Sequence, residues 1–331
     1  MINGIINIHK EAGFTSHDVV AKMRGICGQK KIGHTGTLDP QATGVLPVCL
    51  GSATKLCDML TDKDKEYVTE LLLGRTTDTQ DVTGEILTES AVEVSEEQVR
   101  AAVMSFVGDY NQVPPMYSAL KVNGKKLYEL AREGKEVERK ARPVKILEIA
   151  ILDMQLPIVK MRVACSKGTY IRTLCADIGD KLGCGGTMKS LVRTRVSDFT
   201  LENAVTLSQL QALKDAAGEK ISAGETVSGG GDGGSDGAGV SAGAPTVLGE
   251  WYEQVVLPVD MCFGECPKLH VQEKWRKLLE NGNSFYASQT LENRTYPEEM
   301  WVRVYREDES FAGIYAFDSG RKWYKPVKMF L

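Results

Sequence analysis

The sequence predicts a fold of mixed α and β structure, with surface helices packed against a sheet and a smaller β-rich region at the C-terminus. Apolar residues recur at helical spacing in several segments, while in 158–165 they alternate with polar ones as in a half-buried strand. Short, aromatic-rich strands separated by tight turns crowd residues 301–330. These observations together favour an α+β class with two domains.

Capping residues delimit two of the helices. Ser16 is expected to cap a helix that ends at Gly28. Ser95 and Gln98 have the spacing of a capping box ahead of a second helix, for which Gly108 supplies the stop. Both helices carry one apolar stripe, so we expect each to lie on the surface of a sheet.

Strands are expected at 67–73, 146–152 and 158–165. The last of these leads through a short turn into a helix over 171–182, marked by apolar residues at helical spacing. Arg172 therefore falls on the first turn of that helix, on the side opposite the apolar stripe.

The C-terminal region is expected to begin with a helix around 271–279. Strands follow at 301–305, 311–317 and 323–330, which suggests a small barrel or sandwich. Four aromatic residues of these strands are interpreted as core rather than as platforms for stacked bases: Trp301, Tyr305, Trp323 and Tyr324.

Composition narrows the class of protein. The chain has 331 residues with 42% hydrophobic content, enough to bury a substantial core. No apolar leader opens the chain and no apolar run is long enough to span a bilayer, so we expect a cytoplasmic protein without membrane association. Its eight cysteines are expected to be reduced thiols, and Cys262 and Cys266 lack the additional ligands of a zinc site.

The net charge of −4 is unevenly distributed. Residues 215–250 hold six acidic residues and one lysine, which leaves a net charge of +1 on the remainder. This segment also contains 11 of the 33 glycines, so we interpret it as a flexible insertion that cannot bury enough apolar surface to fold. Gly229, Gly231 and Gly234 fit a G-x-G-x-x-G pattern, but without a preceding strand they predict no dinucleotide site.

Two basic stretches favour a nucleic-acid partner. The first, 121–145, is interleaved with glutamates, so solvated helix faces explain it as well as RNA contact does. The second argues more strongly for RNA, and its members are Lys167, Arg172, Lys181, Lys189, Arg193 and Arg195.

The most informative segment is the loop at 33–47, which places one acid among glycines, threonines and prolines. Pro40 restricts Asp39 to extended geometry, while Gly36 and Gly44 permit backbone conformations closed to other residues. A purely structural alternative is an Asx turn in which Asp39 bonds to nearby amides.

Residues 33–55, GHTGTLDPQATGVLPVCLGSATK, resemble the catalytic signature of the bacterial TruB family of tRNA pseudouridine synthases. Further matches to this family follow in order at 65–67, 74–81, 114–121, 166–172 and 191–195. The resemblance implies a pseudouridine-synthase-like mixed, mainly antiparallel sheet with flanking helices, and a β-rich PUA-like domain at the C-terminus.

The resemblance also implies a division of the chain. A catalytic domain is expected over 1–214, the Gly-rich acidic insertion over 215–250, a connecting segment over 251–266 and the PUA-like RNA-binding domain over 267–331. The insertion departs from the usual compact pattern of the family.

The activity implied is isomerisation of the uridine at position 55 in the T loop of tRNA. The bond from ribose C1′ to base N1 breaks, and C1′ then bonds to C5. Because no redox change or group transfer occurs, no cofactor and no metal are expected. We expect a monomer that binds tRNA without an obligate protein partner. Two alternatives stay open: an RNA-binding module that folds tRNA, and a synthase that acts on another RNA.

Residue roles are carried over from the family one by one. Asp39 is expected to be the nucleophile, and Arg172 to keep that carboxylate ionised and oriented. Tyr67 is expected to stack on the target base and to help remove the C5 proton. His34 would enter the RNA loop after base flipping. The other substrate-binding residues implied are Lys55, Asp81, Tyr170 and Leu191. Whether Asp39 attacks C1′ or abstracts the 2′ proton to give a glycal stays open.

Overall fold

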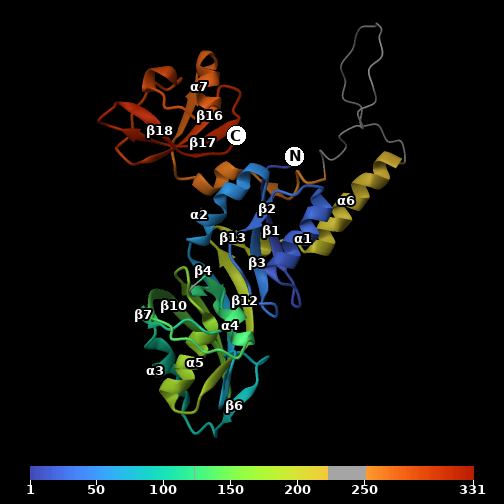
Figure 1. Cartoon of the computed structure of the whole chain (residues 1–331), viewed down its shortest axis with the longest axis vertical. Coiled ribbons are helices and arrows are strands. Elements are labelled where there is room, and N and C mark those ends of the chain that lie inside the picture. The colour runs from blue at the N-terminus through green and yellow to red at the C-terminus, as the bar shows by residue number, and fades with distance from the viewer. Residues whose placement is uncertain (123, 223–250) are drawn as a thin grey trace.

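A computed structural model describes residues 1–122, 124–222 and 251–331 of the chain. Figure 1 shows an elongated body built around one large sheet, with a second, smaller sheet at one end. Most of the segment predicted to be a flexible insertion therefore lies outside the described residues, although its first residues continue the helix α6 (Leu207–Ser222).

The large sheet has ten strands, in the order β14-β1-β3-β12-β4-β11-β10-β7, with β2 paired to β3 and β13 to β12. Neighbouring strands are antiparallel except for β3 and β12, so the predicted mixed, mainly antiparallel sheet is confirmed. The strands are β1 (Gly4–Lys10), β2 (Ile32–His34), β3 (Thr43–Leu50), β4 (Lys65–Leu73), β7 (Gly108–Gln112), β10 (Arg142–Gln155), β11 (Ile158–Cys165), β12 (Gly186–Val196), β13 (Phe199–Thr200) and β14 (Val256–Leu257).

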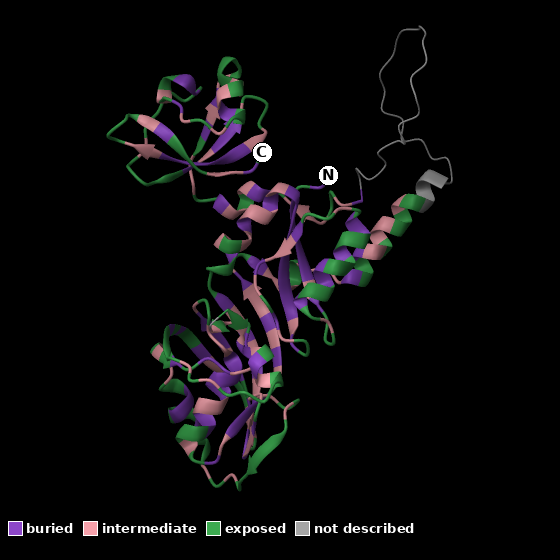
Figure 2. Cartoon of the chain, viewed as in Figure 1, coloured by how far each residue is buried: buried purple, intermediate pink, exposed green. Residues whose placement is uncertain are grey.

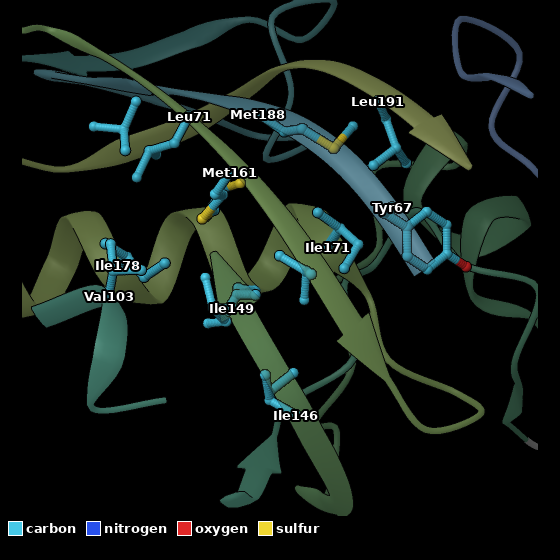
Figure 3. Packing of buried hydrophobic residues seen from close by; sticks show 14 of the residues in the cluster. Tyr67, Leu71, Val103, Ile146, Ile149, Met161, Ile171, Ile178, Met188 and Leu191 are labelled. Atoms are coloured by element: carbon cyan, nitrogen blue, oxygen red, sulfur yellow. The ribbon is translucent and has the colours of Figure 1, made fainter. Parts of the chain in front are cut away.

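Two pairs of helices cover this sheet. The helices α1 (Ser16–Cys27) and α6 pack on the half formed by β1 and β3. The helices α3 (Glu96–Met104) and α5 (Ile171–Leu182) cover the half formed by β4, β10 and β11. Figure 2 shows the buried residues concentrated where these helices meet the strands, and Figure 3 shows the apolar cluster beneath α5.

The alternation predicted for 158–165 is confirmed, because Val159, Met161, Val163 and Cys165 are fully buried. The α5 helix also has its predicted bounds. Of the two predicted N-terminal caps, the capping box at Ser95 is confirmed. The other prediction is wrong, because α1 is capped by Thr15 with Asp18 and not by Ser16.

Ser16 is not the cap because its hydroxyl is used elsewhere. It accepts a hydrogen bond from the backbone amide of Leu38 at 2.9 Å. The predicted stop at Gly108 is also wrong: α3 ends at Met104, and Gly108 opens strand β7.

The C-terminal sheet has four strands in sequence order, with a parallel pair followed by two antiparallel pairs. They are β15 (Lys268–Val271), β16 (Trp301–Arg306), β17 (Phe311–Asp318) and β18 (Trp323–Met329). The helix predicted around 271–279 is corrected, since Val271 ends a strand and only α7 (Arg276–Glu280) is α-helical.

The aromatic residues of this sheet divide into two groups. Tyr305 and Tyr324 are buried, as interpreted from the sequence. Trp301 is 40% exposed and Trp323 is partly exposed, so neither is a fully enclosed core residue. An apolar cluster that includes Phe263 of the connecting segment joins the C-terminal sheet to the large one.

Shorter elements lie between the strands of the two sheets. They are the hairpin β5 (Arg75–Thr77) with β6 (Ile86–Glu89), the hairpin β8 (Lys121–Val122) with β9 (Lys125–Lys126), the helices α2 (Cys57–Thr61) and α4 (Leu127–Arg132), and the 3₁₀ turns η1 (Gly51–Leu56), η2 (Leu201–Asn203), η3 (Val259–Phe263), η4 (Glu273–Trp275) and η5 (Ala287–Gln289).

All eight cysteines are free thiols. Across the described ranges, no helix is both long and apolar enough to cross a bilayer. Within the same ranges, no group of three or more His, Cys, Asp and Glu side chains is arranged to hold a metal ion.

Candidate active site

The loop that carries Asp39 joins β2 to β3, and a buried lysine binds its backbone. The carbonyl of Pro40 accepts hydrogen bonds from the Lys10 ammonium at 3.0 Å and from the Gly13 amide at 2.9 Å. The Lys10 ammonium also donates to the carbonyl of Phe14 at 2.6 Å. The backbone of the loop is therefore fixed independently of the Asp39 side chain.

The Asp39 carboxylate faces Arg172. The Arg172 Nε lies 3.0 Å from Asp39 Oδ2, and Nη2 donates to Oδ1 at 3.2 Å. In the described part of the chain Arg172 supplies the hydrogen bonds to this carboxylate, and no loop amide does. The Asx-turn alternative is therefore wrong, and the side chain points out of its own loop.

Arg172 is held in turn by backbone carbonyls. Its side chain is only 5% exposed, and it donates to the carbonyls of Thr79 at 2.9 Å and Tyr117 at 2.8 Å. Its place at the start of α5 depends on Tyr170, whose backbone amide and carbonyl both bond to the Gln112 side chain. Arg172 lies on the first turn of α5, as predicted, and its guanidinium is buried between Asp39 and these two carbonyls.

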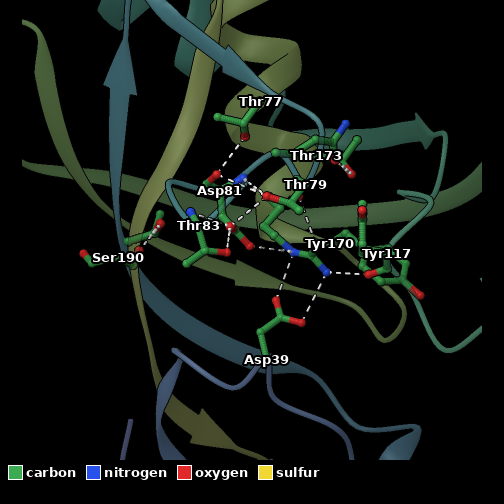
Figure 4. A network of polar contacts seen from close by, with 12 residues as sticks. Asp39, Thr77, Thr79, Asp81, Thr83, Tyr117, Tyr170, Thr173 and Ser190 are labelled. Carbon is green, nitrogen blue, oxygen red and sulfur yellow. Dashed lines mark hydrogen bonds and ion pairs between the residues drawn. The ribbon is translucent and has the colours of Figure 1, made fainter. Parts of the chain in front are cut away.

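Asp81 lies on the other side of the same guanidinium group, as Figure 4 shows. Its Oδ2 is 3.9 Å from Arg172 Nε. Its Oδ1 accepts hydrogen bonds from the Thr79 hydroxyl at 2.9 Å and from the amide of Thr83 at 3.0 Å. One buried cation therefore separates two carboxylates, of which only Asp39 is substantially exposed, at 35% of its side chain.

Burial raises the pKa of Asp39 above its ordinary value of 3.8. The Arg172 guanidinium opposes this rise, and the Asp81 carboxylate adds to it. The charged form of the Asp39 carboxylate therefore depends on Arg172.

Tyr67 lies on β4 within the large apolar cluster and is 8% exposed. Burial raises its pKa to about 12, and Arg193 acts in the opposite direction. Leu191 on β12 is 9% exposed and belongs to the same cluster. Figure 3 places Leu191 and Tyr67 at the same end of that cluster.

His34 ends β2 at the start of the loop. Its Nδ1 accepts a hydrogen bond from the Gly36 amide at 3.2 Å, and its ring meets that of His17 edge-on with centroids 6.2 Å apart. Burial lowers its pKa, and His17 and Arg193 lower it further. Tyr170 is half-buried at the N-terminus of α5, and burial raises its pKa.

Lys55 is not brought into this group. It lies on η1, and its ammonium donates to the carbonyl of Met329 on β18 at 2.8 Å. The structure thus joins Asp39, Arg172 and Asp81 in one polar network, places Tyr67 and Leu191 in one apolar cluster, and puts Lys55 at the junction with the C-terminal sheet.

Two further residues contact the Asp39 loop: Lys10 and Arg193, which are 0% and 1% exposed, respectively. Lys10 was not singled out from the sequence, and Arg193 was considered only as part of the second basic stretch, whereas its burial keeps it from the surface. Burial lowers the pKa of Lys10 to about 8. A lysine that closely follows the apolar residues Ile5, Ile6 and Ile8 is the signal that could have found Lys10, because lysines are rarely fully buried.

Comparison with known proteins gives a consistent result. The family model described as TruB family pseudouridylate synthase (N terminal domain) matches residues 24–171, and the tRNA pseudouridylate synthase B C-terminal domain model matches 172–263. A protein named tRNA pseudouridine synthase B from Lachnoclostridium phytofermentans is 48% identical over 343 aligned residues, covering 100% of both chains. Its namesake from Alkaliphilus oremlandii is 42% identical over 99% of this chain and 98% of the relative.

Solved structures share the fold. A Cbf5-Nop10-Gar1 complex gives a TM-score of 0.68 at 24% identity, covering 99% of this chain and 85% of that one. An H/ACA RNP bound to a substrate RNA containing 2′-deoxyuridine gives a TM-score of 0.67 at 23% identity, with the same coverage. At these identities the likeness concerns the fold alone.

Proposed function

The chain belongs to the TruB family of pseudouridine synthases, and from this premise we propose that it isomerises the uridine at position 55, in the T loop of tRNA. The observation that carries the proposal is the two-point contact between Arg172 and Asp39. It holds one partly exposed carboxylate, and favours its charged form, in the middle of a loop whose sequence matches the family signature.

In this proposal Asp39 acts on the ribose. Breaking the C1′–N1 bond develops positive charge at C1′, which a fixed carboxylate can stabilise or attack. Arg172 contacts both carboxylate oxygens, so it orients them and favours ionisation. Asp81 binds the same guanidinium and completes its support. Direct attack at C1′ and removal of the 2′ proton are both compatible with this arrangement.

The extruded base would lie against Tyr67. We propose that the uracil ring stacks on Tyr67 beside Leu191, in the apolar surroundings these residues share. Tyr170 would border the same pocket, and His34, at the head of the loop, would occupy the gap that the flipped nucleotide leaves in the RNA.

We assign tRNA binding to both sheets. Residues 1–214 would form the catalytic domain and 267–331 a PUA-like domain that contacts the acceptor end, with 215–250 an insertion between them. We further propose that the protein works in the cytoplasm as a monomer, without a cofactor or an obligate protein partner.

The proposal is tested by mapping pseudouridine in tRNA transcripts incubated with the purified protein. We expect the wild type to convert the T-loop uridine, and Asp39→Asn to abolish conversion while binding tRNA with similar affinity. Asp153→Asn, on an exposed part of β10, serves as the matched control. Conversion by Asp39→Asn would refute the catalytic assignment, and conversion only at another site or in another RNA would refute the proposed substrate.

The same variant separates catalysis from RNA folding. If the main contribution were to open and re-anneal tRNA, Asp39→Asn would restore tRNA function in a strain that lacks the modification. The polar network around Asp39 favours chemistry, because a module that only binds RNA has no need of a partly buried, ion-paired carboxylate.

A further inference from the structure

Arg193 is a buried cation without a carboxylate partner. It is 1% exposed, and in the described residues no Asp or Glu forms an ion pair with it. Its Nε donates to the carbonyl of Val45 at 2.7 Å and its Nη2 to the carbonyl of Gly36 at 3.3 Å. Gly36 lies near the start of the Asp39 loop and Val45 on β3, just after the loop, so one guanidinium bridges the two sides of that loop.

The sheet places Arg193 between that loop and Tyr67. On β12 it is paired in register with Tyr67 of the antiparallel neighbour β4 and with Gly44 of the parallel neighbour β3. A Cβ at Gly44 would lie 2.2 Å from the Arg193 carbonyl oxygen, so only glycine permits this approach. Side chains of directly opposed residues lie on one face of a sheet, which brings the guanidinium and the phenol together.

The charges around Tyr67 differ in sign. Burial raises the pKa of its phenol, and Cys165 on β11 and Asp39 on the loop raise it further. The charge of Arg193 lowers it. Conversely, Tyr67 is the group that favours the charged form of Arg193. The other cations nearby are Lys10 and Lys65, whose pKa values Arg193 lowers.

We propose that Arg193 is a positioning residue that acts through Tyr67, stabilising its phenolate so that the tyrosine oxygen can accept the C5 proton of the product-forming intermediate. Once C1′ has bonded to C5, the C5–H bond breaks and its proton passes to the Tyr67 oxygen. The electron pair of that bond forms the C5–C6 double bond, the pair of the C6–N1 double bond moves to N1, and N1 takes up a proton from solvent. This inference rests on the proposed function.

The test is the isotope effect on kcat for tRNA carrying uridine deuterated at C5. Arg193→Gln is expected to lower kcat by about 10- to 100-fold with little change in KM, which is part of the roughly 10²- to 10⁴-fold that general acid–base catalysis contributes, because the base itself is retained. It is also expected to increase the deuterium isotope effect and to displace the rise of kcat with pH to higher pH. Arg193→Lys retains the charge and should show smaller changes in the same direction.

The isotope effect separates this role from a purely structural one. A misplaced Asp39 loop would slow cleavage of the C1′–N1 bond and would not increase the sensitivity to deuterium at C5. An unchanged isotope effect and pH profile would overturn the inference, whatever the fall in kcat. Should Arg193→Gln not fold, Arg193→Lys decides by the same readouts.

Arg162→Gln is the matched control. Arg162 lies on the neighbouring strand β11, is 41% exposed, and forms an ion pair with Glu148 at 2.8 Å. It is expected to leave kcat, the isotope effect and the pH profile unchanged. A wild type that leaves the T-loop uridine unmodified would refute the proposed function itself, and this inference with it.

Discussion

The two sheets of this protein bury different kinds of side chain. The large sheet and its helices enclose four cations that are at most 7% exposed: Lys10, Lys65, Arg172 and Arg193. The C-terminal sheet instead encloses aliphatic and aromatic residues, among them Phe285, Tyr315 and Tyr324. Since removing a charge from water is costly, the burial of these cations is expected to lower the stability of the large sheet, and among the described residues of the small sheet no cation is buried to the same extent.

The largest expected effect follows from removing the cation between two carboxylates. Arg172→Met should lower turnover by about 10²- to 10³-fold, because the charge that orients Asp39 is lost. It should also lower the free energy of unfolding by about 3 kcal/mol, because its buried partners are left unpaired. Single-turnover assays and denaturant titrations measure the two effects.

An arginine of the small sheet provides the control. Arg303 donates to the carbonyls of Cys266 at 2.8 Å and Gly264 at 3.0 Å. Arg303→Met is expected to reduce stability and leave kcat unchanged. Equal losses of turnover in both variants would contradict the expectation that only the buried cations of the large sheet serve catalysis.

The second effect is on pH dependence. In the proposed mechanism Asp39 reacts in its ionised form, and its pKa in the folded protein lies above 3.8, so kcat should fall on acidification at a higher pH than for an ordinary aspartate. An acid limb centred at or below 3.8 would contradict this.

Stability should change in the opposite sense. Because the folded pKa of Asp39 exceeds the unfolded one, its cost to stability is fully present above the folded pKa and disappears below the unfolded pKa. Unfolding free energies of the wild type and Asp39→Asn, measured across that range, should therefore converge at low pH.

A smaller effect is expected at the junction of the sheets. Lys55→Met removes the hydrogen bond to the Met329 carbonyl and should lower stability by about 1 kcal/mol. Turnover at saturating tRNA should not change, because Lys55 lies outside the Asp39 network. A large fall in kcat of Lys55→Met would contradict this and would support the active-site role that the family resemblance implies for Lys55.

The smallest effect concerns the core of the small sheet. The Tyr324 hydroxyl donates to the Arg294 carbonyl at 3.0 Å and accepts from the Tyr296 amide at 3.2 Å. Tyr324→Phe should cost about 0.5–1 kcal/mol and leave catalysis unaffected. Thermal unfolding measures the first expectation and pseudouridine mapping the second. Loss of activity would show that this core is coupled to the site.

Sequence patterns correctly predicted those elements that depend only on residues close together in the chain. The capping box at Ser95 and the alternation in 158–165 depend on neighbouring residues, and both are confirmed. The cap of α1 was misplaced by one residue because Thr15 and Ser16 both carry hydroxyls. The choice between them depends on Asp18 and on a contact from Ser16 to Leu38, 22 residues away.

For the candidate site, too, short motifs predicted some residues, whereas contacts between distant parts of the chain could not be predicted. Short motifs identified Asp39, Arg172 and Asp81, and the structure brings these three into contact. The motifs did not reveal the Thr79 and Tyr117 carbonyls that hold Arg172, because any residue can supply a carbonyl. They also could not place Lys55, whose partner lies 274 residues further along the chain.

The sequence alone determined the family, the α+β class and the residues of the reactive loop, because glycine, proline and capping residues act on the backbone within a few positions. Only the tertiary structure decided which charges are buried and what they face. The order of strands sets β12 between β3 and β4 and so brings Arg193 to both the Asp39 loop and Tyr67. Burial and charge pairing are properties of such long-range neighbours, and they control the pKa values on which the chemistry depends.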